Sequence, residues 1–210
     1  MESVLSIRDV YRASSLLDDR SSSSPNLDLA TVRGRLTELC GERGHPQVTL
    51  AVDLIAQAHQ GGEPAAWIGS CTSLFYPPDA TDWNLDWSAL AFIQLQDTRR
   101  LLRGADKLLR SGAFGLVVID LVGLDHRRLS DPLMGRLLRL AKTHDSAVVF
   151  LTQRPPSAPS ISSLVSLRTG ARWLQIDPAR LRSKFTIAKD KRRGPGRTFC
   201  EVYDGPLGLC

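Results

Sequence analysis

Residues 34–70 read GRLTELCGERGHPQVTLAVDLIAQAHQGGEPAAWIGS. The run Arg35–Cys40 places apolar leucines three positions apart in a short segment, and we interpret it as a strand. In Val48–His59 the apolar residues recur at helical spacing on one face, so this segment is predicted to be a helix that a Gly-Gly pair ends. Ala65–Gly69 is short and apolar, which predicts a second, buried strand. A strand, a glycine-containing turn, a helix and a strand in this order are typical of an α/β sheet.

The same alternation continues toward the C-terminus. Further strands are predicted at Ala89–Leu95, Gly115–Leu121 and Ala147–Thr152, and further helices at Thr98–Arg110 and Pro132–His144. The tail differs, because it contains short apolar runs at Arg172–Ile176, Lys184–Ala188 and Thr198–Tyr203 with no helix between them. The expected fold class is therefore α/β, with a mostly parallel sheet that is flanked by helices and extended by antiparallel strands at the C-terminal end.

Composition excludes several classes of protein. The chain has 210 residues, 42% of them hydrophobic, and its net charge is +5. It has no run of 18 apolar residues, and its first residues, MESVLSIRDVYR, lack the pattern of a secretory signal, so we expect a cytoplasmic protein. The four cysteines are far apart and the four histidines do not fall at ligand spacing beside them, which favours free thiols and no metal. The positive charge permits a nucleic acid or an acidic partner without proving either.

The N-terminal residues are interpreted as a separate arm. Ser21–Ser24 and the following Pro25 cannot pack into a core, so residues 1–25 are predicted to be an arm with a serine-rich linker, and residues 26–210 the core domain. The arm has one apolar helical face, formed by Val4, Ile7, Val10 and Tyr11. That face is too small to fold alone, so it must dock on its own domain, on a second copy or on a partner.

The turn between the first predicted strand and helix has the position of a phosphate-binding loop. Residues 41–48 read GERGHPQV, whereas the working pattern is G-x-x-x-x-G-K-[ST]. Gly41 fits the first position and Gly44 lies inside the loop, but Pro46, Gln47 and Val48 replace the second glycine, the lysine and the hydroxyl residue. Proline has no N–H for a phosphate, glutamine has no charge, and valine has no oxygen for magnesium. We therefore expect no nucleotide cofactor.

Four segments in the same order resemble the RecA recombinase family. They are residues 34–70, then LLRSGAFGLVVIDLVGL at 108–124, VVFLTQR at 148–154 and FTIAKDKRRGPG at 185–196. In RecA the second carries the Walker B aspartate, which falls on Asp120, and the third ends in the nucleotide-sensing glutamine, which falls on Gln153. The fourth carries two lysines that reach a neighbour's nucleotide, and these fall on Lys189 and Lys191. The resemblance covers about residues 33–205 and implies a RecA-like fold of the P-loop NTPase type.

The departures from that family imply that the chain is not an enzyme. The catalytic glutamate of RecA should follow the second strand, where this chain has Ser70, Cys71 and Thr72 and hence no carboxylate. Asp120 remains, and we interpret it as a cap of the turn after its strand. Gln153 either serves a switch as in RecA or forms a hydrogen bond with a loop.

A basic segment near the C-terminus is the candidate DNA contact. It consists of Lys189, Lys191, Arg192, Arg193 and Arg197, and its glycines and proline predict a mobile turn. Such a turn contacts phosphates without distinguishing bases. A solvated hairpin tip with no ligand is the alternative.

Two other segments are weaker candidates for binding. Pro155–Gly170 matches the mobile DNA-binding loop of RecA in position, but Arg168 is its one cation. Trp83 and Trp87 lie four residues apart and could anchor a partner, although core packing is expected for at least one of them.

Residues 73–97, SLFYPPDATDWNLDWSALAFIQLQD, contain a Y-P-P stretch followed by an L-D pair. In this they resemble ImuA proteins, the RecA-like component of bacterial mutagenic repair cassettes. That resemblance implies a non-catalytic adaptor in SOS-induced error-prone translesion synthesis. Its partners would be RecA, an ImuB-like homologue of Y-family polymerases and an error-prone replicative-type polymerase. Two alternatives stay open: a SulA-type division inhibitor that binds a tubulin-like protein, and a residual DNA-binding ATPase.

Overall fold

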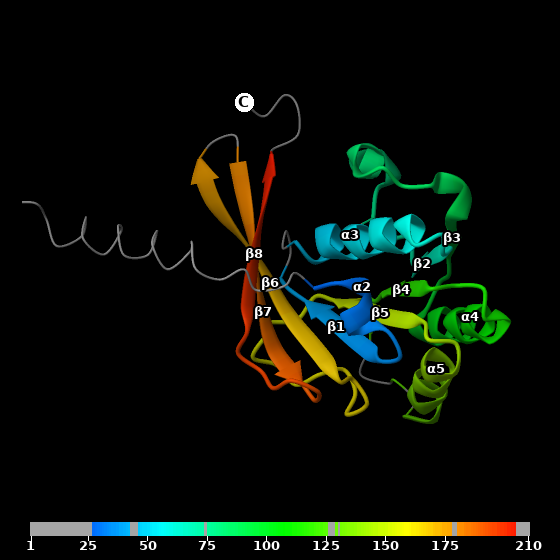
Figure 1. The fold of residues 1–210 in the computed structure, drawn as a ribbon. Coiled ribbons are helices and arrows are strands. Elements are labelled where there is room, and N and C mark those ends of the chain that lie inside the picture. Colours follow the sequence, from blue (N-terminus) through cyan, green and yellow to red (C-terminus); the bar gives the residue numbers. More distant parts are fainter. Residues whose placement is uncertain are drawn as a thin grey trace, which may run out of the picture.

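The computed structural model describes residues 27–42, 46–73, 75–125, 129, 131–177 and 180–204. These residues form one eight-stranded sheet with the strand order β3-β2-β4-β5-β1-β6-β7-β8 (Figure 1). The strands are β1 (Leu36–Cys40), β2 (Ala65–Gly69), β3 (Leu90–Gln94), β4 (Leu116–Asp120), β5 (Ala147–Thr152), β6 (Leu167–Asp177), β7 (Arg180–Asp190) and β8 (Thr198–Asp204). The helices are α2 (Leu29–Val32), α3 (Gln47–Gln60), α4 (Thr98–Ser111) and α5 (Asp131–Thr143), with two 3₁₀ helices, η1 (Pro77–Trp83) and η2 (Trp87–Ala89).

The sheet has the expected mixed topology. The six strands from β3 to β6 pair in parallel, whereas β7 and β8 add to the end of the sheet as antiparallel strands. The predicted fold class, α/β with a mostly parallel sheet and antiparallel strands at the C-terminal end, is confirmed, and the arrangement is consistent with a RecA-like fold.

The expected length of the tail strands was wrong. Arg172–Ile176 and Lys184–Ala188 were predicted as short strands, but β6 and β7 each have 11 residues and pair along almost their whole length. The ends of β6 and β7 are difficult to predict from the sequence because polar residues occupy them. Thr169 and Ser183 are fully buried and Arg168 nearly so, and a polar residue at a buried strand position breaks the apolar pattern on which the prediction depends.

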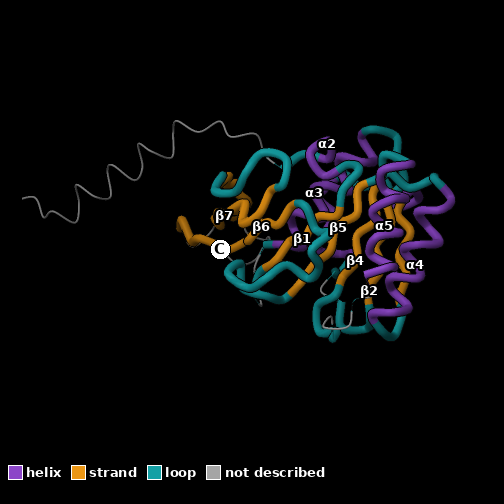
Figure 2. Tube along the Cα trace, turned by 90° about the horizontal axis from the view of Figure 1, so that it is seen from below, coloured by secondary structure: helices purple, strands orange, loops and turns teal. Residues whose placement is uncertain are grey.

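Helices cover both faces of the parallel part of the sheet. Alternate residues of β4 point to opposite faces: Val118 packs in the core under α3, whereas Val117 packs under α4 and α5. Figure 1 shows α3 on one face, and Figure 2 shows α4 and α5 side by side across the other. The carboxyl ends of β1, β2, β4 and β5 therefore lie at one edge of the sheet, where loops carry the candidate nucleotide residues.

Some predictions fall outside the described residues. These are the arm of residues 1–25, including Val4, Ile7, Val10 and Tyr11, and Gly44 of the phosphate-loop segment. Within the described part of the chain, none of the helices combines the length and the apolar character needed to cross a membrane.

Candidate functional site

The segment that has the position of a phosphate loop joins β1 to α3. Gly41 is buried, and its N–H donates to the Thr152 carbonyl at 3.2 Å. Pro46 is the N-cap of α3 and provides no side-chain cap. The Gln47 side chain, at the position of the phosphate lysine, is fully buried, and among the described residues neither its Oε1 nor its Nε2 has a hydrogen-bond partner. Val48 packs against the core beneath α3.

Asp120 lies at the same edge and forms hydrogen bonds within the chain. Its Oδ1 accepts from the Val122 N–H at 3.0 Å, and its Oδ2 accepts from the Ser73 hydroxyl at 2.6 Å. The Ser73 oxygen in turn accepts from the Trp67 indole N–H at 3.1 Å. Asp120 thus accepts hydrogen bonds from the turn that follows its strand and from the loop after β2.

The residues that replace the catalytic glutamate form a hydroxyl cluster. Ser70 Oγ and Thr72 Oγ1 lie 2.7 Å apart, and Thr72 donates to the Val122 carbonyl at 3.2 Å. This contact joins the loop after β2 to the loop after β4. Cys71 between them is exposed, as is Gln153 at the end of β5.

A buried ion pair that the sequence did not reveal joins β1 to β6. Glu38 and Arg168 are both buried, and Arg168 Nε lies 3.2 Å from Glu38 Oε2. The other carboxylate oxygen accepts from the Thr152 hydroxyl at 2.9 Å, and Oε2 also accepts from the Ile161 N–H at 3.1 Å. A glutamate inside the apolar run LTELC was the one available signal, since a charge in a central strand needs a partner.

Arg168 also fixes the loop that follows β5. Its Nη1 donates to the carbonyls of Pro156, at 2.7 Å, and Ala158, and its Nη2 donates to that of Pro155 at 3.0 Å. The sequence placed Arg168 within a mobile loop that ran to Gly170. That expectation was wrong, because β6 begins at Leu167 and Arg168 is an internal support of the loop instead of a solvent-facing cation.

Cys40, the last residue of β1, lies next to this support. Its thiol donates to the Thr169 carbonyl at 3.4 Å. Burial raises the pKa of the Cys40 thiol to about 11, so this sulfur stays protonated and unreactive at neutral pH.

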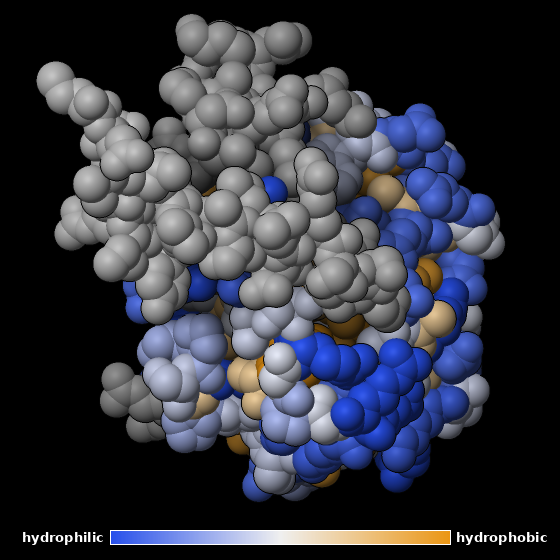
Figure 3. All heavy atoms as spheres, turned by 60° about the vertical axis from the view of Figure 1, so that its left-hand side comes forward, coloured by the Kyte–Doolittle hydropathy of each residue, from blue (hydrophilic) through white to orange (hydrophobic). Residues whose placement is uncertain are grey.

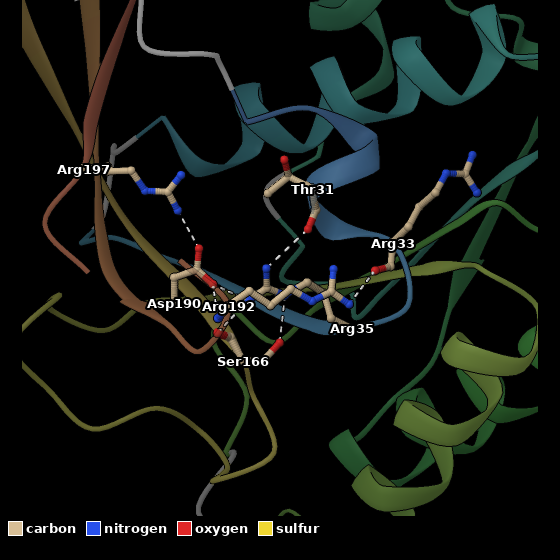
Figure 4. A network of polar contacts seen from close by, with 7 residues as sticks. All are labelled: Thr31, Arg33, Arg35, Ser166, Asp190, Arg192 and Arg197. Atoms are coloured by element: carbon tan, nitrogen blue, oxygen red, sulfur yellow. Dashed lines mark hydrogen bonds and ion pairs between the residues drawn. The ribbon is translucent and has the colours of Figure 1, made fainter. Parts of the chain in front are cut away.

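The basic turn lies at the opposite edge of the sheet. Asp190 pairs with Leu167, the first residue of β6, so the turn that follows β7 projects from the amino ends of the parallel strands. The turn is built around the Asp190 carboxylate, which is buried (Figure 4). Asp190 Oδ1 accepts from Arg35 Nη2 at 2.8 Å and from the Arg192 N–H at 2.9 Å, and Oδ2 accepts from Arg197 Nη2 at 2.5 Å.

The electrostatics of this network follow from its geometry. Burial alone would raise the pKa of Asp190, but the hydrogen bonds from Arg35 and the Arg192 N–H outweigh it and hold that pKa below its usual value. Burial lowers the pKa of Arg35, and Asp190 opposes that effect. Burial and the neighbouring Lys191 lower the pKa of Lys189. The turn is thus a fixed arrangement of cations around one anion.

The five candidate DNA-binding residues therefore differ in how accessible their charged groups are to a phosphate. Arg197 is paired with Asp190, and Lys189 Nζ lies 3.4 Å from the Ser160 hydroxyl. Lys191, Arg192 and Arg193 are exposed, although Lys191 Nζ donates to the Ser163 carbonyl at 2.8 Å. Figure 3 brings forward the side of the molecule that carries β6 to β8, and hydrophilic surface gathers in the lower part of that face.

The two candidate tryptophans also differ in how exposed their side chains are. Trp83 is partly buried and packs against the core beneath α3, whereas Trp87 is 42% exposed. Only Trp87 of this pair presents a large apolar surface to solvent. Phe92 of the edge strand β3, at 40% exposed, was not singled out from the sequence.

The chain is similar to bacterial RecA proteins over part of its length. The RecA N-terminal domain family matches residues 4–128. RecA of Rubrobacter xylanophilus is 38% identical over 116 residues, which cover 53% of this chain and 33% of that protein. RecA of Thermus aquaticus is 32% identical over 155 residues, which cover 63% of this chain and 45% of that protein.

Two points follow from the residues that these matches cover. The chain spans less than half the length of these two curated relatives. The family match begins at residue 4, so the expectation that the resemblance begins only near residue 33 was wrong, and the predicted arm lies within the matched range. Because the match covers more than half of the chain, this protein belongs to the RecA N-terminal domain family.

Proposed function

We propose that this chain is a non-catalytic RecA-like adaptor in SOS-induced, error-prone translesion DNA synthesis. Membership of the RecA N-terminal domain family supports a role in DNA repair. The resemblance of residues 73–97 to ImuA proteins supports the narrower assignment. Its partners in this proposal are RecA, an ImuB-like protein and an error-prone replicative-type polymerase.

One observation carries the non-catalytic part of the proposal, namely the state of the position where RecA has its phosphate lysine. Gln47 is neutral and its side chain is turned fully into the protein. Val48 offers no oxygen to magnesium, and Pro46 offers no N–H to a phosphate. Each lost charge-assisted contact costs about 1.5–3 kcal/mol, so together these replacements weaken nucleotide binding by orders of magnitude.

Direct DNA binding is a secondary part of the proposal. The exposed cations Lys191, Arg192 and Arg193 fit phosphate contacts that do not depend on base sequence. The contacts would be few, so binding would be weak and sensitive to salt.

Isothermal titration calorimetry with magnesium-ATP tests the absence of nucleotide binding. We expect no binding by the full chain at micromolar concentration, with an active RecA as the positive control. Micromolar affinity would contradict the proposal. A variant that restores the pattern, Pro46→Gly with Gln47→Lys and Val48→Thr, serves as a comparison for whether these positions alone prevent binding.

Co-precipitation tests the adaptor role separately. The full chain is presented with RecA, the ImuB-like protein and a tubulin-like division protein in parallel. Retention of RecA or the ImuB-like protein supports the proposal. Retention of the division protein alone would favour the SulA-type function instead.

A further inference from the structure

A shallow groove of about 360 Å³ runs along the outer side of α5. It is lined by Gly135, Leu138, Arg139, Lys142 and Thr143, which lie on one face of the helix because their spacing is three or four residues. Gly135 and Leu138 give the groove an apolar floor, while Arg139 and Lys142 are exposed cations. No part of the nucleotide-site remnant belongs to it.

Among the described residues, no contact requires a glycine at position 135. Its backbone is not among the described glycines with positive φ, and a Cβ at this position would meet only Leu164 Cδ1 at 3.8 Å, an ordinary contact. Gly104 in α4 differs, because a Cβ there would lie 3.0 Å from Leu95 Cδ1. Glycine destabilises the interior of a helix relative to alanine. The missing side chain at position 135 therefore serves mainly to leave the groove open.

The rim of the groove is positively charged beyond α5. The loop that contacts Gly135 through Leu164 also receives a hydrogen bond from Lys191, whose Nζ donates to the Ser163 carbonyl at 2.8 Å. A Cβ added at Gly34 would lie 3.9 Å from Arg192 Nη2 and 4.0 Å from Lys142 Cα, so the basic turn and the end of α5 meet there.

Two acidic groups lie near these cations. Asp190 is buried and paired with Arg35 and Arg197, whereas Asp145 is exposed, lies 4.0 Å from Arg33, and has its Oδ1 3.9 Å from the same Cβ position at Gly34. The groove is therefore an apolar depression flanked by cations on the helix and on the turn. The cations of the turn are held in place because the Asp190 carboxylate fixes its backbone.

We propose that this groove binds an acidic segment of a partner protein, with one apolar side chain entering beside Gly135 and Leu138 and the flanking carboxylates meeting Arg139, Lys142 and Lys191. The apolar floor favours a peptide over a nucleic acid, because a phosphodiester backbone has no apolar group to place there. The rim also has no aromatic side chain among the residues that line it, so it offers no platform on which bases could stack.

Fluorescence anisotropy with defined probes tests the proposal. The probes are a labelled peptide, Gly-Ser-Asp-Asp-Leu-Leu-Asp-Asp-Gly-Ser, a peptide of equal charge with both leucines changed to serine, and a labelled oligothymidylate. With the full chain we expect the leucine peptide to bind about tenfold more tightly than the serine peptide. Filling the groove with Gly135→Leu, or reversing its charge with Arg139→Glu and Lys142→Glu, should weaken the leucine peptide at least about tenfold.

Two controls keep the outcome interpretable. Reversal of the exposed α4 cations with Arg103→Glu and Lys107→Glu matches the charge change on a different surface and should leave peptide binding unchanged. Gly135→Leu should unfold at the same temperature as the parent chain or higher, since leucine is the better helix former, so a loss of binding cannot be ascribed to unfolding.

Three results would overturn the proposal: equal binding of the leucine and serine peptides, unchanged binding in Gly135→Leu, or loss of oligothymidylate binding in the Arg139/Lys142 variant without any peptide binding. The last result would identify a phosphate-binding surface. None of the probes is RecA or an ImuB-like protein, so the groove can fail this test while the proposed adaptor function stands, and the reverse also holds.

Discussion

At the scale of single residues, the Glu38–Arg168 pair joins the interior of the sheet to the loop after β5. It places two opposite charges inside the sheet and uses the arginine to hold three carbonyls of the loop after β5. The loop after β5 is therefore supported from within the sheet.

Arg168→Met should therefore be strongly destabilising. It leaves the Glu38 carboxylate buried without its partner, and breaking a buried pair costs about 3–5 kcal/mol. Urea unfolding measures the change in free energy. Arg100→Met is the matched control, because Arg100 forms an exposed pair with Asp97 at 3.4 Å, and such pairs contribute about 0–1 kcal/mol.

A second variant separates charge from packing. Arg168→Met combined with Glu38→Gln removes both charges and should recover part of the lost stability. If the single variant lost no more than the exposed-pair control, the pair would not be supporting the loop.

At the scale of elements, side-chain contacts fix the positions of segments whose conformation the sequence pattern does not predict. The last turn of α3 holds the segment before β3, because His59 Nδ1 accepts from the Asp86 N–H at 3.1 Å. Asp190 holds the basic turn after β7, because its carboxylate accepts from the Arg192 N–H of the same turn and from the side chain of the distant Arg35.

His59 should make stability depend on pH. Burial lowers its pKa below the ordinary value of 6.5, so the folded protein favours the neutral ring. The unfolded chain binds the proton first as pH falls, and stability is therefore complete above about 6.5 and declines below it toward the folded pKa. Thermal unfolding between about pH 7.5 and 5.5 measures this trend. His59→Gln should flatten the decline, and an equal decline in that variant would assign it to other groups.

The basic turn should give DNA binding that is weak and independent of sequence. Three exposed cations, Lys191, Arg192 and Arg193, allow a slope of at most about −2.7 in log K against log salt on duplex DNA. Arg192→Glu with Arg193→Glu should abolish the binding. The Arg103→Glu and Lys107→Glu variant is the control, and unchanged affinity in the Arg192/Arg193 variant would show that another surface contacts DNA.

At the scale of the whole molecule, two regions of different character lie at opposite edges of one sheet. The edge with the carboxyl ends carries the nucleotide-site remnant, where Asp120 and Ser73 serve the fold. The other edge carries the basic turn and, beside it, the groove of α5. The proposed function therefore places partner binding at the edge opposite the residues that correspond to a nucleotide site.

Deletion of residues 1–24 tests how the N-terminal arm contributes. If the arm docks on a partner, the melting temperature of the core stays almost unchanged and binding to RecA or the ImuB-like protein falls sharply. Differential scanning calorimetry and co-precipitation measure the two effects. A deletion that lowers stability and leaves partner binding intact would show that the arm docks on its own domain.

The sequence by itself determined the elements and their order. Short apolar runs predicted β1, β2 and β5, and an apolar face at helical spacing predicted α3, each within one residue of its observed ends, because these patterns depend on neighbouring residues alone. The sequence also shows that Pro46, Gln47 and Val48 depart from the phosphate-loop pattern and that Ser70–Thr72 contain no carboxylate, since these positions belong to short motifs. The hydrogen bond from the Val122 N–H to Asp120 fits the place of Asp120 at the end of an apolar strand.

Only the tertiary structure decided which distant residues meet. Arg35 and Asp190 are 155 positions apart in the sequence. Glu38 and Arg168 lie on β1 and β6, which are neighbours in the sheet although β2 to β5 come between them in the sequence. The sequence placed Arg168 in an irregular loop and Arg197 in a basic turn, where a charged residue is usually exposed. Arg168 is instead buried against Glu38, and Arg197 pairs with Asp190. Such pairings depend on the strand order, which no local pattern specifies. The residues that line the groove beside Gly135 all belong to α5, and only the tertiary structure shows that the basic turn lies near the end of that helix.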